Sequence, residues 1–329
     1  MRKGSQNNMK NEERKVEKMT LREIKNNHPE IFNRFEDMAK PYCTRLFDLG
    51  EENKGIPDFI ASGTFVRIGG RPGILTNHHI AMMFGLRNRS FIYVPGYKSE
   101  KIHGLRYKHI VSLPHYPADW EIKGVDISFI ELESETAIVD LGYNIWDLDK
   151  SAQKHFSEKI NLRKKGAVHD WIWGFEATPS EKVSKQENTL YFEKSGFHFL
   201  APESSDLFTA VVRTSNGDFS KKVDELYCEI NREGEDSALL PESYGGTSGS
   251  AVWRGVGNLP EESISDFDLA GVQADELQWV GPAVAVIFRG PCSLYDTFYK
   301  FCVHYMTHED EIPALQNAGF IKLDLIDPE

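Results

Sequence analysis

GGTSGSAVW, residues 245–253, places Ser248 between glycines and then runs directly into an apolar, strand-like segment. Glycine lets the backbone turn sharply, so this pattern predicts a serine presented on a tight turn. Two upstream stretches complement it: ILTNHHIA ends a β-like run with His78 and His79, and GVDISFIEL sets Asp126 among alternating apolar residues. Together the three stretches supply a nucleophile, a base and a carboxylate.

These residue types suit acyl transfer. A serine hydroxyl is a weak nucleophile at neutral pH, so attack on an amide or ester needs a neighbouring base, usually histidine. A carboxylate bonded to the other ring nitrogen fixes the histidine tautomer and stabilises the imidazolium. Two backbone N–H groups must also meet the developing oxyanion, and a glycine just before the nucleophile allows this.

With its parts in the order His, Asp, Ser, the chain resembles the trypsin-like serine peptidases, in particular their intracellular or bacterial-type branch. Four segments carry the likeness, namely SGTFVRI, ILTNHHI, DISFIEL and GGTSGSAV. The resemblance implies that Ser248 is the nucleophile, His79 the general base and acid, and Asp126 the orienting carboxylate. It also implies an oxyanion hole formed by the N–H groups of Gly246 and Ser248.

The sequence departs from the family pattern at three positions. His78 stands where the family usually has a small residue, and His79 is preferred as the base because Ile80 and Ala81 follow it. Ser250 replaces a common glycine. Thr247 replaces the aspartate that pairs with a freed N-terminus in secreted members, so we expect no activation of that kind.

The resemblance implies an all-β fold of two six-stranded antiparallel β-barrels, and short β-like runs from Phe59 onward agree with it. A capping-box pattern and an apolar stripe predict helix from Thr20 to about Phe47, and helical spacing predicts a closing helix from Leu294 to Tyr305. The expected divisions are a charged helical N-terminal extension at 1–56, the first barrel at 57–150, the second barrel with its helix at 151–308, and an acidic tail at 309–329.

Acidic residues near the serine bear on the substrate. Glu242 lies six residues before Ser248, where the family often places the floor of its specificity pocket, and Asp275 and Glu276 follow the LAGVQA stretch. Acids there would favour protein or peptide substrates cut after Lys or Arg. A peptidase in the cytoplasm must avoid general proteolysis, so we hypothesise narrow specificity or activation by a regulatory protein partner.

Composition limits the function classes. The 38 basic and 50 acidic residues give a net charge of -12, which argues against nucleic-acid binding. We expect no secretory signal and no membrane association, and four scattered cysteines favour the cytoplasm. We also expect no cofactor and no metal, because the spaced histidines lack a supported ligand pattern; they are His103, His109 and His115, with Cys302, His304 and His308 near the C-terminus.

Two alternatives stay open. An α/β-type serine hydrolase would need glycine at Ser250 and would take His304 or His308 as its base. The second alternative is a trypsin-like fold kept as a binding or sensing module without turnover.

Overall fold

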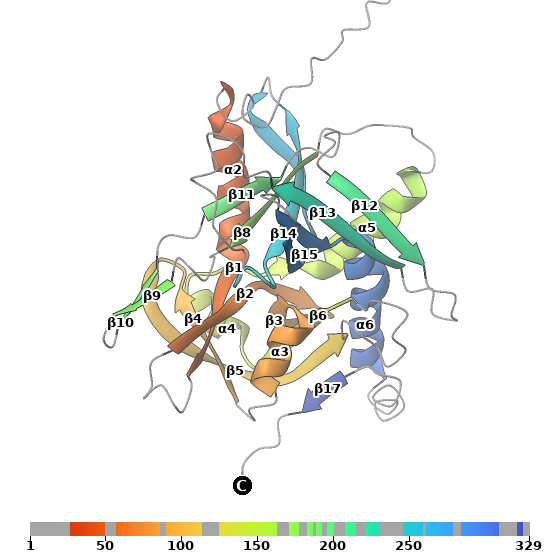
Figure 1. Cartoon of the computed structure of the whole chain (residues 1–329). Helices are drawn as coiled ribbons and strands as arrows, with labels where there is room; N and C mark the ends of the chain where they lie inside the picture. The colour runs from red at the N-terminus through yellow and green to blue at the C-terminus, as the bar shows by residue number, and fades with distance from the viewer. Residues whose placement is uncertain are drawn as a thin grey trace, which may run out of the picture.

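The chain folds into two β lobes, with the first lobe below the second in Figure 1 and α5 (Leu148–Leu162) on the connection between them. The structure is a computed structural model and describes residues 27–49, 57–85, 90–113, 125–162, 171–177, 183–186, 189–192, 196–200, 208–214, 222–230, 246–258, 261–278, 284–308 and 321–324. In these ranges, no helix has both the length and the apolar character needed to cross a bilayer.

The first lobe is a closed barrel. Its hydrogen-bonded strand order is β1–β4–β5–β6–β3–β2, and β2 pairs back with β1, so six strands form a ring. The first six-stranded barrel expected from the sequence is therefore confirmed. Its strands are β1 (Cys43–Leu49), β2 (Pro57–Ile68), β3 (Arg71–Thr76), β4 (Phe91–Gly96), β5 (Ser99–Leu113) and β6 (Ile127–Leu132), with β7 (Trp146–Asp147) paired to β2 and β17 (Ile321–Asp324) to β5.

The second lobe is an open sheet of seven strands in the described ranges, which differs from the expected closed six-stranded barrel. A sheet closes only when its two edge strands tilt far enough to hydrogen-bond each other, and here the edges β11 and β12 pair with one neighbour each. The sheet order is β11 (Gly196–Leu200), β8 (Trp171–Ala177), β14 (Ala251–Asn258), β15 (Ser263–Gln278), β16 (Val284–Arg289), β13 (Lys222–Ile230) and β12 (Phe208–Thr214), and β9 (Val183–Gln186) with β10 (Thr189–Phe192) forms a separate hairpin.

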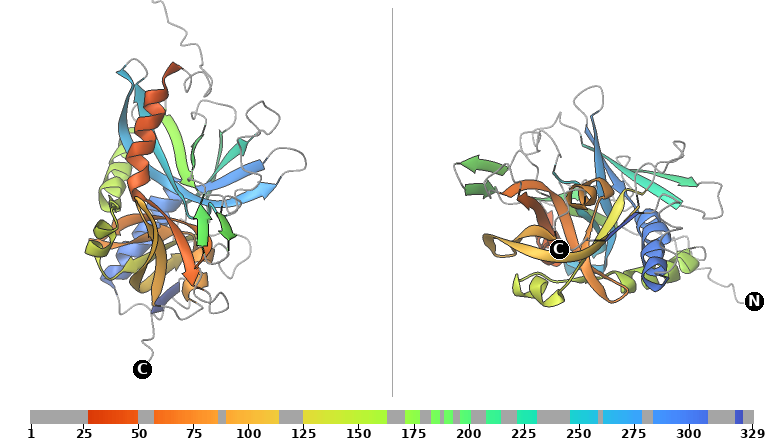
Figure 2. Two further views of the ribbon diagram at one scale, coloured as in Figure 1. Left: turned by 90° about the vertical axis from the view of Figure 1, so that its left-hand side faces the viewer. Right: turned by 90° about the horizontal axis from the view of Figure 1, so that it is seen from below.

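The helix predicted up to about Phe47 ends earlier. Helix α2 (Pro29–Ala39) packs on β8, β14 and β15 and lies beside the second lobe in Figure 2. Pro41 lacks the N–H that would continue the helix, so a single 3₁₀ turn, η1 (Lys40–Tyr42), follows it. Residues 43–49, which the sequence placed in the N-terminal extension, are instead strand β1 of the first barrel, because they pair with β2.

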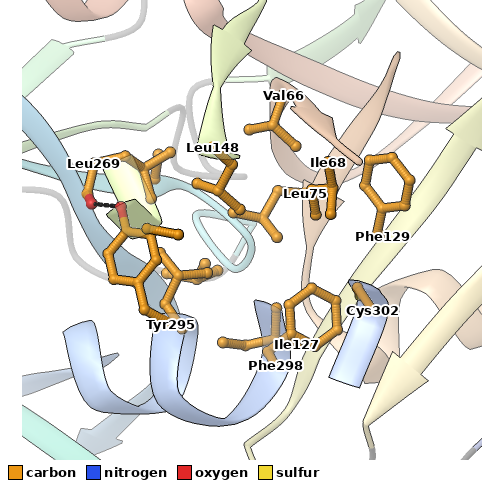
Figure 3. Close-up of a cluster of buried hydrophobic side chains, with 14 of the residues drawn as sticks. Val66, Ile68, Leu75, Ile127, Phe129, Leu148, Leu269, Tyr295, Phe298 and Cys302 are labelled. Atoms are coloured by element: carbon orange, nitrogen blue, oxygen red, sulfur yellow. Dashed lines mark hydrogen bonds between the residues drawn. The ribbon is translucent and has the colours of Figure 1, made fainter. Parts of the chain in front are cut away.

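A hydrophobic core joins the two lobes. Side chains of β2, β3 and β6 meet side chains of β15 and of the C-terminal helical segments η6 (Cys292–Tyr299, π-helical) and α6 (Lys300–Thr307), as Figure 3 shows. The Tyr295 hydroxyl donates a hydrogen bond to the carbonyl of Leu269. Full burial of a large apolar side chain contributes about 1.5–3 kcal/mol, so this interlobe core holds the lobes in a fixed relation. Its members include Val66, Ile68, Leu75, Ile127, Phe129, Leu148, Leu269, Phe298 and Cys302.

A second cluster, the barrel core, fills the first barrel. Short helices α3 (His78–Gly85) and α4 (Glu135–Asp140) contribute to it beside the strands. It includes Leu46, Ala61, Phe65, Ile74, Ile80, Phe84, Ile92, Leu105, Ile110, Ile130 and Ile138. Since every one of these strands has apolar residues facing inward, the barrel is a packed scaffold from which site residues project at its ends.

Candidate active site

The segment that carries His79 changes from strand to helix at Asn77. The sequence predicted that the β-like run continues through the paired histidines, but β3 ends at Thr76 and α3 begins at His78. Ile80, Ala81 and Phe84 are buried on one face of this helix, and that apolar face explains why a helix forms. His79 lies on the opposite side, with 48% of its side chain exposed.

The ring of His79 contacts the carboxylate of Asp126. Nδ1 of His79 lies 3.0 Å from Oδ2 and 3.3 Å from Oδ1, and the His79 backbone N–H donates to Oδ1 over 3.2 Å. Asp126 is 3% exposed, so these contacts compensate a carboxylate that is almost removed from water. This arrangement fixes the orientation of the imidazole through Nδ1.

The backbone around Asp126 is also constrained. Asp126 has a φ of 51°, in the left-handed region that costs a residue with a side chain on the order of 1 kcal/mol. The buried side-chain amide of Asn77 donates to the Asp126 carbonyl over 2.9 Å. Asp126 is therefore held at two points: Asn77 binds its backbone carbonyl, and His79 binds its carboxylate.

Ser248 lies on a compact turn before β14. Gly246 and Gly249 have φ values of 83° and 86°, a region that glycine adopts without strain. The N–H and the hydroxyl of Ser250 both donate to the carbonyl of Thr247, over 3.0 and 2.6 Å. Ser250, where glycine is usual in the family, therefore closes the turn through its side chain.

The turn is hydrogen-bonded to both lobes. Gly249 N–H donates to the carbonyl of Gln273 in β15 over 3.0 Å, and Ser62 N–H in β2 donates to the carbonyl of Ser248 over 3.0 Å. The Ser62 hydroxyl adds a bond of 3.2 Å to the carbonyl of Gly246. These contacts bring the turn against the first barrel.

Packing at Gly249 locates the turn more closely. A Cβ at this position would lie within 3.0 Å of Thr76 Oγ1 and of the Ser62 carbonyl oxygen, so only glycine fits. Thr76 is the last residue of β3 and stands three residues before His79. The structure thus brings the Ser248 turn to the strand end from which α3 and His79 begin.

One contact of a reactive triad is not formed. Between the described residues, the Ser248 hydroxyl makes no hydrogen bond to His79, and the N–H groups of Gly246 and Ser248 donate none. Catalytic hydrogen bonds are often long without a bound substrate. The arrangement can therefore hold an imidazole near a serine turn, two of whose N–H groups donate to none of the described residues.

The side chains predicted for a substrate pocket lie outside the part of the chain that the structure describes. Glu242 lies outside the described residues. The backbones of Asp275 and Glu276 pair with β16 opposite Ile287 and Val286, and their side chains lie outside the description. The preference for Lys or Arg stays a prediction.

The other histidines lie in different settings. His78 contacts Ser112, His109 binds the buried carboxylate of Glu131 over 2.7 Å, and His304 stacks on His308 at the end of α6 with ring centroids 4.3 Å apart. His115 lies outside the described ranges. In the described part of the chain no three metal-ligating side chains gather in one place.

Sequence reasoning missed two residues that organise the site. Asn77 precedes the paired histidines, and a buried asparagine at a strand end is a signal for a backbone contact. Ser62 opens the SGTFVRI segment, but only the fold brings it to residues 246 and 248, which are more than 180 positions later. No local pattern predicts that contact.

Comparisons with known proteins leave the family open. No protein-family model and no curated protein matches the chain. Among solved structures, it is similar to a thermostable serine protease from an extremophilic microorganism, with 11% sequence identity and a TM-score of 0.35, over 79% of this chain and 97% of that one. A likeness of this size does not establish a family or an activity, so the function has to be inferred from the residues themselves.

Proposed function

We propose that the protein is a serine endopeptidase that cleaves protein substrates through an acyl-enzyme. The observation that carries the proposal is the buried carboxylate of Asp126, which binds Nδ1 of His79 over 3.0 Å beside the Ser248 turn. Asp126 holds the imidazole in the tautomer whose Nε2 accepts a proton. Ser248 attacks the scissile carbonyl while its proton passes to His79.

The second half of the reaction uses the same groups. His79 gives the proton to the leaving amine, then takes a proton from the water that attacks the acyl-enzyme, and returns it to Ser248 Oγ as the bond to the acyl group breaks. The N–H groups of Gly246 and Ser248 are the donors proposed for the oxyanion, because both belong to the glycine-rich turn. Loss of one such donor lowers kcat by about 10²–10³-fold in related chemistry.

Substrate choice is the finer part of the proposal. Glu242, Asp275 and Glu276 would favour Lys or Arg before the cut bond through charge pairing. Cleavage of a peptide library tests this directly: cuts concentrated after Lys and Arg support the acidic pocket, and equal turnover after apolar residues contradicts it. We further propose that activity in the cytoplasm is restricted by narrow specificity or by a partner protein.

An active-site-directed fluorophosphonate probe tests the activity itself. We expect wild type to be labelled, Ser248→Ala to be unlabelled and His79→Ala to react at a greatly reduced rate. Labelling that persists in Ser248→Ala contradicts the proposed nucleophile. A truncation for the same assay should remove only residues 1–26. It then keeps α2, which packs on the second lobe, and β1, which belongs to the barrel.

The competing function is a binding module without turnover. The observation that favours it is that, between the described residues, the Ser248 hydroxyl makes no hydrogen bond to His79, whereas an activated serine needs its base within hydrogen-bond reach. Absence of labelling in both the full chain and the 27–329 truncation would support this second function. An α/β-type hydrolase would instead lose labelling in His304→Ala and keep it in His79→Ala.

A further inference from the structure

His78, the residue before the proposed base, is bound into a row of buried hydroxyl groups. Its Nδ1 lies 2.6 Å from the hydroxyl of Ser112 in β5, and this hydroxyl is hydrogen-bonded to the hydroxyl of Ser128 in β6. Ser112 and Ser128 are fully buried. A buried serine hydroxyl needs a polar partner, and the imidazole of His78 is such a partner for Ser112.

Strand register explains why these hydroxyls meet. Ser112 is directly opposite Ser128 across β5 and β6, and Thr76 is opposite Ser128 across β3 and β6. On the outer side, the backbone of Ser112 pairs with Ile321 of β17. Ser112 therefore sits in a strand that has neighbours on both sides, so it is a fixed anchor.

The hydroxyls belong to the inside of the barrel. Side chains alternate along a strand, so Ser112 lies on the same face as Ile110 and Ser128 on the same face as Ile130. Ile110 and Ile130 are members of the barrel core. The hydroxyls of Ser112 and Ser128 consequently form a polar end of that core, and Ser112 contacts His78, the first residue of α3.

The row connects the two segments that carry the proposed base and its carboxylate. His78 is adjacent to His79, and Ser128 of β6 stands two residues after Asp126, which directly precedes that strand. One side of this connection is the direct contact between His79 and Asp126, and the other side is the path from His78 through Ser112 to Ser128. Because the segment of His78 and His79 is held by these two contacts, it cannot rotate about one of them without breaking the other.

We propose that His78 is a positioning residue, which fixes the first turn of α3 by its bond to Ser112 and so holds the His79 ring against Asp126. The inference rests on the proposed function for its kinetic readout only. It also gives a reason for the bulky residue at a position where the resembled family has a small one: the imidazole of His78 binds the buried hydroxyl of Ser112.

The test compares variants that break and restore one bond. His78→Ala and Ser112→Ala each remove it, whereas His78→Asn keeps a neutral amide group near the place of Nδ1. His103→Ala is the matched control, since His103 is another half-buried histidine of the first barrel, in β5 opposite Val94. Rates of Ser248 labelling by a fluorophosphonate, with kcat and KM on any peptide substrate found, are measured beside the melting temperature of each variant.

We expect His78→Ala and Ser112→Ala to lower the labelling rate and kcat by about 10- to 100-fold with KM nearly unchanged, since small misplacements of a catalytic group have effects of this order. His78→Asn should return to within about threefold of wild type. The double variant should be no slower than the slower single variant, because both changes remove the same interaction.

Three outcomes would each overturn the proposal: folded variants that keep wild-type rates, effects that multiply in the double variant, and no recovery in His78→Asn. So would a loss in His78→Ala as complete as in His79→Ala, because His78 would then be the base.

A second readout does not depend on activity. Nitrogen-15 NMR of the histidine rings reports the bond between His79 Nδ1–H and Asp126 even in a protein that turns nothing over. The His79 ring signal should shift or broaden in His78→Ala and Ser112→Ala and return in His78→Asn. An unchanged His79 signal in both alanine variants contradicts the positioning role, whereas a changed signal in a protein that never labels at Ser248 keeps it and contradicts only the peptidase.

Discussion

The first lobe carries His79 and Asp126 on two neighbouring segments of one closed barrel, whereas the second lobe carries Ser248 on a turn whose contacts cross to the first lobe. The pair of His79 and Asp126 joins residues 47 positions apart, and the contacts described for it, His79 with Asp126 and Asn77 with the Asp126 carbonyl, lie within the first lobe. The Ser248 turn is bound to Ser62 and packed on Thr76 as well as hydrogen-bonded to β15.

This difference separates two kinds of preorganisation. The base and carboxylate depend on the integrity of one barrel, which closes on itself and has no free edge in its ring. The nucleophile depends on how the two lobes meet, which is set by the interlobe core and by a few contacts around Ser62. Changes inside the barrel and changes at the lobe boundary should therefore impair the protein in distinguishable ways.

The largest effect should come from breaking the pair within the barrel. Asp126→Asn removes the charge that stabilises the His79 imidazolium and permits the wrong tautomer, so the rate of Ser248 labelling should fall by about 10⁴-fold. The measurement is the second-order labelling rate, with His103→Ala as the control. A loss below about tenfold would contradict the role given to Asp126.

The next effect should come from forcing the turn away from the barrel. Gly249→Ala adds a methyl group within 3.0 Å of Thr76 Oγ1 and the Ser62 carbonyl at a φ of 86°, so the backbone must shift and labelling should fall by about 100-fold or more. Melting temperature and labelling rate are measured together.

Gly70→Ala is the matched control for that change. Gly70 also has a positive φ, 75°, but a methyl group there meets nothing within 4 Å. It should lose only about 1–2 kcal/mol of stability from the left-handed backbone and keep its labelling rate. Equal rates in the two variants would show that contact between the turn and the barrel is unimportant.

A smaller effect should follow from removing one hydrogen bond between the two lobes. Ser62→Ala removes the hydroxyl bond to the Gly246 carbonyl and leaves the backbone bond to Ser248 in place. One hydrogen bond contributes about 0.5–1.5 kcal/mol, so labelling should fall by roughly threefold to tenfold. Ser157→Ala, in which an exposed serine of α5 loses a comparable bond to the Lys154 carbonyl, should be neutral.

Substitution of Glu131 should have the smallest effect on activity, although it should lower the stability of the barrel. Burial alone would raise the pKa of Glu131, but hydrogen bonds and charges from His109 and Arg71 outweigh it and lower the pKa from its ordinary 4.5 to about 2. Lys108 lies 3.4 Å from the same carboxylate. Because the folded pKa is the lower one, this stabilisation is present above about pH 4.5 and is lost as the pH falls toward 2.

Glu131→Gln should therefore unfold at lower urea than wild type at pH 7, and the gap should close between about pH 4.5 and pH 2. Labelling of Ser248 at pH 7 should stay within about twofold of wild type, since Glu131 touches neither His79 nor the turn. A gap in stability that does not depend on pH would contradict the charge interaction.

The sequence predicted much of the first lobe because its strands have clear alternation and short turns. It failed at residues 43–47, where an apolar stripe suits either a helix or a strand and only pairing with β2 decides for the strand. It also failed at α3, because the eight residues from His78 are too few to show helical spacing against a preceding β-like run.

Order and flanking residues indicated His79, Asp126 and Ser248 as the candidate site, and their roles stay predictions. The sequence could not indicate Ser62, Ser112 or Ser128, because single serines in strands carry no local signal. Their importance arises from register and from contacts between distant segments. The function of such residues becomes visible only when the barrel is closed.

The most direct measurement is a crystal structure of the protein after reaction with a fluorophosphonate. We predict phosphorus bonded to Ser248 Oγ, a phosphonyl oxygen within hydrogen-bond distance of the N–H groups of Gly246 and Ser248, and His79 still bound to Asp126 with Nε2 turned toward the adduct. Phosphorus on another side chain, or a His79 ring that has left Asp126, would contradict the proposed site.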